Sequence, residues 1–166
     1  MNRRGFTLIE ISVVIALIGM VMLLVIPRLP STEQENLKIS ARTLAATLRY
    51  MQERAAAQRT NYYLVFSPGS ESLTIHELGS DGSGKEPADP LLQKPPLKEG
   101  TQVADVVIPR YGKISDGHIR IDVGMGGFRD FVTIHLRSPG GKFRTVMAFP
   151  AGGKVKHYEG YKDGPD

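Results

Sequence analysis

One long apolar segment near the N-terminus constrains this chain more than any other feature. It runs from Phe6 to Ile26, and its polar members are Thr7, Glu10 and Ser12. A helix of this length, at about 1.5 Å per residue, reaches across a hydrocarbon layer of about 30 Å. The rest of the 166 residues is enough for one modest domain. The sequence therefore predicts a membrane-crossing helix followed by a separate folded region.

The charges around the apolar segment predict its orientation. Arg3 and Arg4 precede it without acidic neighbours, so the positive-inside rule keeps the N-terminus in the cytoplasm. We expect a single-pass anchor over residues 6–30 in a bacterial inner membrane, with the C-terminal domain in the periplasm. A cleaved secretory signal peptide is the alternative, but its apolar region is usually about 7–15 residues long and ends at a small-x-small site. The sequence Ile26–Pro30 is a poor site of that kind, which favours the anchor.

Glu10 is an acidic residue inside the apolar segment and needs an explanation. A carboxylate at such a depth costs about 2.5–3.5 kcal/mol on insertion scales. If the chain is cut between Gly5 and Phe6, the new α-amino group of Phe6 lies one helical turn away on the same face. That amine, or the one on a neighbouring copy, would pair with the carboxylate and set the axial register between subunits. The other interpretation is that Glu10 lies near the headgroups and is tolerated there.

The seven residues from Arg4 to Glu10, Arg-Gly-Phe-Thr-Leu-Ile-Glu, closely resemble the processing site of type IV pilins and type II secretion pseudopilins. The resemblance implies that residues 1–5 are a prepilin leader, that a prepilin peptidase cuts after Gly5, and that it N-methylates Phe6. It also implies that Glu10 guides addition of the subunit to a filament. The implied partners are other pilins or pseudopilins, the peptidase, an inner-membrane assembly platform and membrane lipid.

Residues 31–60 have the pattern of an amphipathic helix. Apolar residues recur at spacings of three and four, the period of one buried helical face: Leu37, Ala41, Leu44, Leu48, Met51 and Ala55. On the outer face, Arg49 and Glu53 are four residues apart, and we expect Arg42 and Arg54 to point to solvent. The pattern predicts a helix that covers a core with one side.

After Asn61 the period changes from helical to extended. The strand-like runs are 62–66, 73–77, 103–108, 118–123, 131–136, 143–149 and 154–158. Turn residues at 67–70 predict a hairpin of the first two runs, and those at 138–141 and 151–153 predict an antiparallel meander of the last three. Residues 79–101 are rich in Gly and Pro, which predicts a flexible loop.

These elements together predict an α+β fold. A long N-terminal helix, with a membrane-spanning first half and an amphipathic second half, would pack on an antiparallel β-sheet domain of residues 61–166. This region resembles the H-class minor pseudopilins and FimT-like minor pilins in the step at Leu136–Gly140 and in the closing turn and strand at Phe149–Val155. It departs from that group at Lys154, where Arg is frequent.

The resemblance implies a minor pseudopilin that assembles into the periplasmic pseudopilus of a type II protein secretion system and contacts neighbours or secreted cargo. The alternative is a FimT-like minor type IV pilin that contributes to pilus assembly or DNA uptake. Cations of the last hairpin would then contact phosphates: Lys142, Arg144, Lys154 and Lys156, with His157. A solvated edge that discourages strand pairing explains the same residues. The net charge of +4 includes Arg3 and Arg4 of the leader and does not demand nucleic acid, so DNA is the less favoured partner.

Residue types and spacings argue against an active site. The chain has no cysteine, which excludes a disulfide, a thiolate metal site and a cysteine nucleophile. We expect no metal and no cofactor, because the four histidines lack metal-binding spacing. They are His76, His118, His135 and His157. The segment 79–85 looks like the start of a phosphate loop, but Glu86 replaces the expected Ser or Thr and Pro87 hinders the helix. We therefore do not expect an enzyme.

Overall fold

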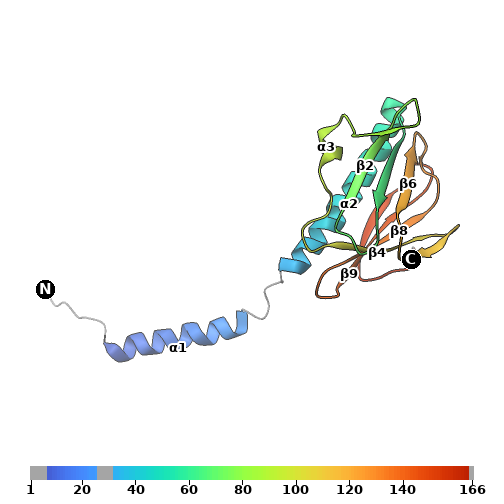
Figure 1. The fold of residues 1–166 in the computed structure, drawn as a ribbon. Helices are drawn as coiled ribbons and strands as arrows, with labels where there is room; N and C mark the ends of the chain where they lie inside the picture. The colour runs from blue at the N-terminus through green and yellow to red at the C-terminus, as the bar shows by residue number, and fades with distance from the viewer. Residues whose placement is uncertain (1–6, 26–31, 165–166) are drawn as a thin grey trace. The chain divides into compact units, whose positions relative to one another are not determined.

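The computed structural model describes residues 7–25 and 32–164, which belong to two units, Met1–Ser31 and Thr32–Asp166 (Figure 1). The predicted leader, the cleavage residues Gly5 and Phe6, and residues 26–30 of the predicted anchor lie outside the described residues.

The first unit contains helix α1 (Leu8–Val25). Thr7 stabilises its start, because the Thr7 Oγ1 accepts a hydrogen bond from the Glu10 N–H at 3.3 Å. The large apolar side chains described in α1 are all exposed, from 45% at Val14 to 88% at Leu8. No helix in the described ranges is both long enough and apolar enough to cross a membrane. Within its own unit, α1 therefore buries none of these large side chains.

In the described part of the second unit, ten strands form two five-stranded sheets. The first sheet has the order β3-β2-β1-β6-β7, with β1 (Tyr62–Phe66), β2 (Leu73–Leu78), β3 (Gly84–Lys85), β6 (Ile119–Gly124) and β7 (Gly127–Phe128). The second has the order β10-β9-β8-β4-β5, with β4 (Gln102–Ile108), β5 (Gly112–Ile114), β8 (Val132–Arg137), β9 (Phe143–Ala148) and β10 (Val155–Glu159). All pairings between these named strands are antiparallel.

The predicted α+β class, the β1–β2 hairpin and the β8–β9–β10 meander are confirmed. The division into two sheets was not predicted. It arises because β6 returns to pair with β1, with Tyr62 opposite Val123, while β4 pairs with β8. These partners are distant in the chain, and alternation of apolar and polar residues does not specify which distant strands pair.

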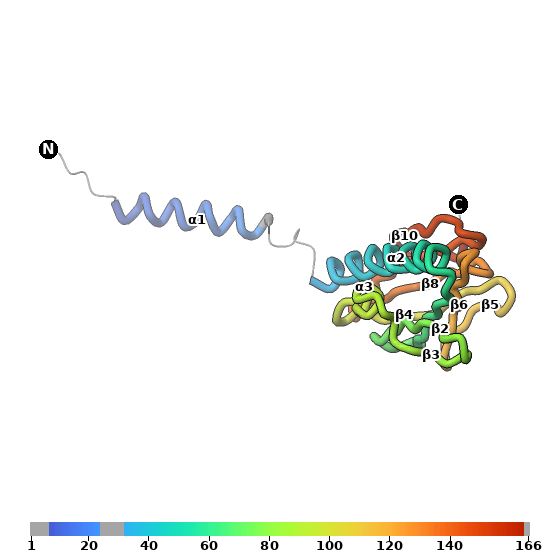
Figure 2. The backbone as a smooth tube through the Cα atoms, turned by 90° about the horizontal axis from the view of Figure 1, so that it is seen from above, coloured from blue at the N-terminus to red at the C-terminus, as the bar shows by residue number. Residues whose placement is uncertain are grey.

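Helix α2 (Thr32–Gln58) packs on strands of both sheets. Its buried positions follow the helical period and include all six apolar residues predicted for this face: Leu37, Ala41, Leu44, Leu48, Met51 and Ala55. In Figure 2, β10 runs beside α2, and the two elements are in contact. The helix therefore closes the core and also borders the last strand of the chain.

The segment 79–101 holds more structure than its composition predicts. It contains β3 and a short helix, α3 (Pro90–Gln93), whose first turn is capped because the Asp89 carboxylate accepts a hydrogen bond from the Leu91 N–H at 3.0 Å. Leu92 and Leu97 are buried in the core. The prediction that this segment lacks regular structure is wrong, because two leucines dock an otherwise Gly- and Pro-rich stretch.

Asp89 also joins α3 to α2. Its Oδ2 accepts a hydrogen bond from the Tyr50 hydroxyl and lies 2.9 Å from the Arg54 Nη2. The Tyr50 hydroxyl first, and then the Leu91 N–H and Arg54, hold the pKa of Asp89 below its ordinary value. The expectation that Arg54 points freely to solvent is therefore wrong, because the guanidinium is half-buried and ion-paired.

Candidate functional site

Glu10 is the predicted assembly residue that falls within the described residues. It lies in the first turn of α1, and its side chain is exposed. Its predicted partner is the amine that cleavage would create on Phe6, a residue outside the described ranges. The charge pair therefore stays a prediction.

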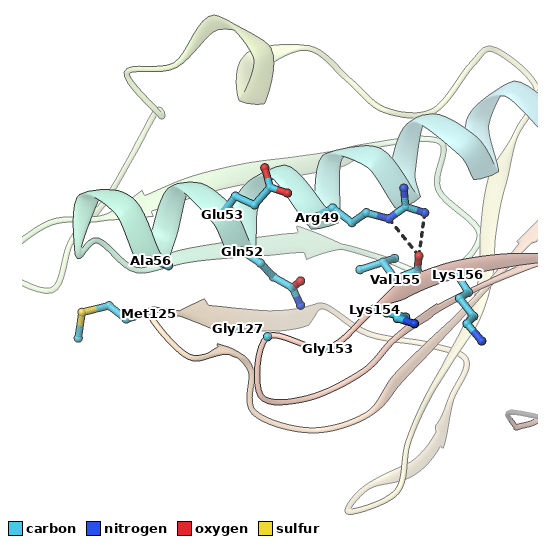
Figure 3. Close-up of a pocket in the computed structure, with 11 residues that line it drawn as sticks. Arg49, Gln52, Glu53, Ala56, Met125, Gly127, Gly153, Lys154, Val155 and Lys156 are labelled. Atoms are coloured by element: carbon cyan, nitrogen blue, oxygen red, sulfur yellow. Dashed lines mark hydrogen bonds between the residues drawn. The ribbon is translucent and has the colours of Figure 1, made fainter.

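A groove of about 510 Å³ lies between α2 and the turn that leads into β10 (Figure 3). Its walls come from α2, from the β6–β7 turn and from the start of β10: Arg49, Gln52, Glu53, Ala56, Met125, Gly127 and the range 152–156. We call this surface the α2–β10 groove. It is the place where the predicted amphipathic helix and two of the predicted basic residues, Lys154 and Lys156, meet.

Arg49 ties the helix to the strand at the groove. Its Nε and Nη2 both donate to the Val155 carbonyl oxygen, at 3.0 Å and 2.8 Å. A hydrogen bond from a charged donor is stronger than a neutral one, and a fork of two such bonds fixes the guanidinium plane. Sequence reasoning placed Arg49 on a solvated helix face, and no spacing rule could have paired it with a carbonyl 106 residues away.

The floor of the groove depends on close backbone contact. Gly127 has φ of +85°, and a Cβ placed on it would lie 2.6 Å from the Gly152 nitrogen, so only glycine fits there. Beneath this contact Gln52 is 8% exposed, and its Nε2 has no hydrogen-bond partner among the described residues. An unpaired buried amide is unfavourable by about 1–3 kcal/mol, so Gln52 is a buried polar group that the described residues do not satisfy.

Positive charge surrounds β10. Burial lowers the pKa of His157 first, and the nearby charges of Arg42, Arg144 and Arg49 lower it further. Arg144 lies opposite Glu159 in the strand register, and its Nη2 is 3.8 Å from the Glu159 carboxylate.

The predicted basic residues do not share one face. The register of β9 and β10 puts Arg144 and His157 on one side of the sheet and Lys156 on the other. There the Lys156 Nζ lies 6.0 Å from the centre of the Phe149 ring. Lys142 lies at the β8–β9 turn, where its N–H donates to the Ser138 Oγ at 3.3 Å.

A second polar cluster, missed by sequence reasoning, centres on His135. This residue is fully buried, and its Nδ1 lies 2.6 Å from the Asp105 carboxylate while its Nε2 lies 2.9 Å from the Lys162 carbonyl oxygen. The ring stacks on Tyr161 at 3.7 Å, and the Tyr161 hydroxyl donates to Asp105 at 3.1 Å. Lys113 donates to the same hydroxyl at 2.8 Å. The cluster fastens the C-terminal segment to the sheet.

The remaining histidines and the phosphate-loop-like segment have structural surroundings. His118 lies 2.9 Å from the Ser67 hydroxyl, and His76 stacks on Tyr63. In the segment 79–85, the Gly79 N–H donates to the Ser83 carbonyl oxygen, which makes it the turn between β2 and β3 rather than the start of a helix. The described residues contain no group of three potential metal ligands.

Comparison with known proteins places these features in a family context. Residues 1–26 match the prokaryotic N-terminal methylation motif, which includes Gly5, Phe6 and Glu10. Type II secretion system protein H of Vibrio cholerae is 31% identical over 101 residues, which cover 60% of this chain and 52% of that protein. The chain thus spans about half the length of this curated relative.

Solved structures give the fold. One structure of the minor pseudopilin EpsH from the type II secretion system of Vibrio cholerae has a TM-score of 0.56 at 19% identity, over 75% of this chain and 97% of that chain. A crystal structure of EpsH has a TM-score of 0.63 at 19% identity, over 81% and 100%. The chain has the fold of the minor pseudopilin EpsH, and its first 26 residues match the N-terminal methylation motif.

Sequence and structure contribute different parts of the candidate site. The match to the N-terminal motif covers Gly5, Phe6 and Glu10, whose roles stay predictions. The α2–β10 groove becomes visible only when the fold brings Arg49 to Val155.

Proposed function

We propose that this pilin-like chain is a structural subunit, a minor pseudopilin, that joins the periplasmic pseudopilus of a type II protein secretion system. The match of residues 1–26 to the N-terminal methylation motif carries the proposal. A prepilin peptidase cuts after Gly5 and methylates Phe6, and Glu10 then sets the register of the subunit against its neighbours. The likeness to protein H of a type II secretion system supports this choice of machine.

The proposed placement puts α1 in the bacterial inner membrane and the unit Thr32–Asp166 in the periplasm. The exposed apolar side chains of α1 support an environment of lipid or of neighbouring helices. Arg3 and Arg4 support a cytoplasmic N-terminus. The partners are other pseudopilins, the peptidase, the inner-membrane assembly platform and, through the periplasmic unit, secreted cargo.

A structural role also fits the polar clusters of the periplasmic unit. His135 and Asp105 hold the C-terminal segment, and Asp89 holds α3 to α2. Each of these clusters satisfies groups of the chain itself, which supports a subunit rather than an enzyme.

The decisive test is the intact mass of the membrane-extracted chain after co-expression with a prepilin peptidase. We expect loss of residues 1–5 and one added methyl group on Phe6. A Gly5→Leu variant should stay uncut, because bulk before the scissile bond blocks close approach of the protease. A Gly19→Leu variant, in an open position of α1, is the matched control and should be cut normally. An uncut wild-type chain, or one cut near residue 30, would contradict the proposal.

The FimT-like alternative, a minor type IV pilin that contacts DNA, depends on the cations near β10. Lys154 and Lys156 line the α2–β10 groove, whereas Arg144 is paired with Glu159 and Lys142 lies at a separate turn. A phosphate track needs its cations along one surface. This arrangement favours the pseudopilin over the DNA-contacting pilin.

A further inference from the structure

The surface around β10 combines a groove with an unbalanced charge. Arg49, Lys154 and Lys156 line the groove against a single carboxylate, Glu53. Beside it, Arg42 and Arg144 are close enough to His157 to lower its pKa. A surface of this kind attracts negative charge and disfavours a basic partner.

We propose that the α2–β10 groove binds an extended acidic segment of another protein. The inference deepens the proposed function, and it rests on that function in taking the partner to be a neighbouring subunit. The recognition has three parts: backbone pairing along β10, carboxylates on the cations of the groove, and an apolar floor.

The first part is the free edge of β10. The Phe149 N–H donates to the Lys154 carbonyl, and the Gly160 N–H donates to the Phe143 carbonyl. Residues of β10 alternate in direction, so the backbone groups of Val155 and His157 face away from β9, on the outer edge of the sheet. The Val155 carbonyl oxygen already accepts hydrogen bonds from Arg49. The backbone N–H and carbonyl of His157 have no partner among the described residues, which leaves a short edge that an extended segment can join.

The lining of the groove supplies the other two parts, the cations Arg49, Lys154 and Lys156 and an apolar floor. Ala56 and Met125 supply exposed apolar surface, and Met125 is 57% exposed. Gln52 lies at the floor with its Nε2 unpaired among the described residues. A polypeptide offers backbone carbonyl oxygens to the Gln52 amide, carboxylates to the cations, and apolar side chains to the floor.

A nucleic acid fits the same surface less well. Arg144 and Lys156 lie on opposite faces of the sheet, so the cations near β10 form no continuous track for a phosphate backbone, whereas a short peptide needs only the cations that line the groove. Nucleic-acid grooves instead keep the cations along one track and add stacking aromatics. The acidic polypeptide is therefore the occupant that we propose.

The test uses the full chain in detergent micelles and a fluorescent peptide, acetyl-Glu-Val-Glu-Val-Glu-amide, followed by anisotropy at low salt. We expect binding that weakens with added salt, while the peptide with Gln in place of Glu does not bind. The double variant Lys154→Gln and Lys156→Gln should weaken binding by about tenfold, since it removes two of the groove's three cations. The matched control, Lys85→Gln with Lys98→Gln, changes two exposed lysines that do not line the groove and should bind as the wild type does.

Backbone pairing is tested by the amide resonance of His157, which should shift and become protected from exchange when the acidic peptide is added. The inference is overturned by absence of binding at low salt, by equal binding of the Gln peptide, by equal weakening in the control, or by an unchanged His157 amide. Oligothymidylate is the competitor, and tighter binding of it through the same lysines would identify a phosphate surface instead. The mass of the same preparation reports leader cleavage, so failure of the groove and failure of the proposed function are distinguishable.

Discussion

The two long helices of this chain differ in where their apolar surface goes. In α1 the large apolar side chains that the structure describes, as far as Leu23, are exposed by 45% or more. In α2 a single apolar stripe is buried to 0–2%, including Leu37, Leu44, Leu48 and Met51, and most residues on the other faces are polar or small. A helix that is apolar all round needs lipid or other helices, whereas an amphipathic helix needs one core. The difference teaches that α2 is stabilised by the core of its own unit, whereas α1 buries none of its described large side chains within its unit.

The largest expected effect is a difference in the free energy of unfolding between a variant in α2 and a matched variant in α1. Leu48→Ala removes a fully buried side chain of α2 and should lower the free energy of unfolding by about 2–5 kcal/mol. The matched variant Leu17→Ala removes the same atoms from α1, where the side chain is 58% exposed. It should leave the unfolding of the Thr32–Asp166 unit unchanged. Denaturant titration of both full-length variants in detergent, followed by circular dichroism, checks the pair. Equal losses would show that α1 also contributes to this core.

The next effect concerns assembly rather than stability. Glu10→Val should leave membrane insertion and leader cleavage intact but reduce incorporation into filaments about tenfold, which corresponds to about 1.4 kcal/mol of lost attraction. The reason is that the proposed pairing with the Phe6 amine is lost while the helix becomes more apolar. Ser12→Ala is the control, because the Ser12 hydroxyl bonds within the helix to the Leu8 carbonyl. Sheared-filament fractions measured by immunoblot give the result, and normal incorporation of Glu10→Val would refute the charge pair.

The same contrast explains which parts of the fold were predictable. The apolar stripe of α2 follows a local period, and seven strand-like runs correspond to β1, β2, β4, β6, β8, β9 and β10. The very short strands β3, β5 and β7, and the four-residue helix α3, carry too few residues for a periodic pattern. They form because neighbours offer edges and caps, such as the β1–β2 hairpin for β3 and Asp89 for α3.

The candidate site divides in the same way. The N-terminal motif is local, and consecutive residues are enough to recognise it. The groove depends on contacts between distant residues, since Arg49 reaches Val155 and Gly127 approaches Gly152. The buried His135–Asp105 pair likewise joins two strands, β8 and β4, whose pairing the sequence pattern did not specify. The sequence shows that Arg49, His135 and Asp105 are polar or charged, but only the packing of the fold shows which groups they contact.

The smallest expected effect tests how α2 holds α3. The pKa of Asp89 lies below its ordinary value of 3.8, chiefly because the Tyr50 hydroxyl donates to it. A carboxyl whose folded pKa is depressed stabilises the contact above its unfolded pKa and loses that contribution as the pH falls through the folded value. We therefore expect α3 to detach from α2 in acid, below pH 3.8. The Leu91 amide, which donates to Asp89, reports this step in an NMR titration.

Tyr50→Phe removes the first cause of the depressed pKa while keeping the ring. Detachment of α3 should then move to higher pH, towards the ordinary value of 3.8, because the carboxylate loses its donor. Tyr111→Phe, at a ring that is 66% exposed, is the control and should not change the transition. The amide of Leu64 in the core monitors global unfolding, so a transition shared by Leu64 and Leu91 would mean loss of the whole fold. An unchanged Leu91 midpoint in Tyr50→Phe would show that Arg54, rather than the hydroxyl, fixes Asp89 and with it α3.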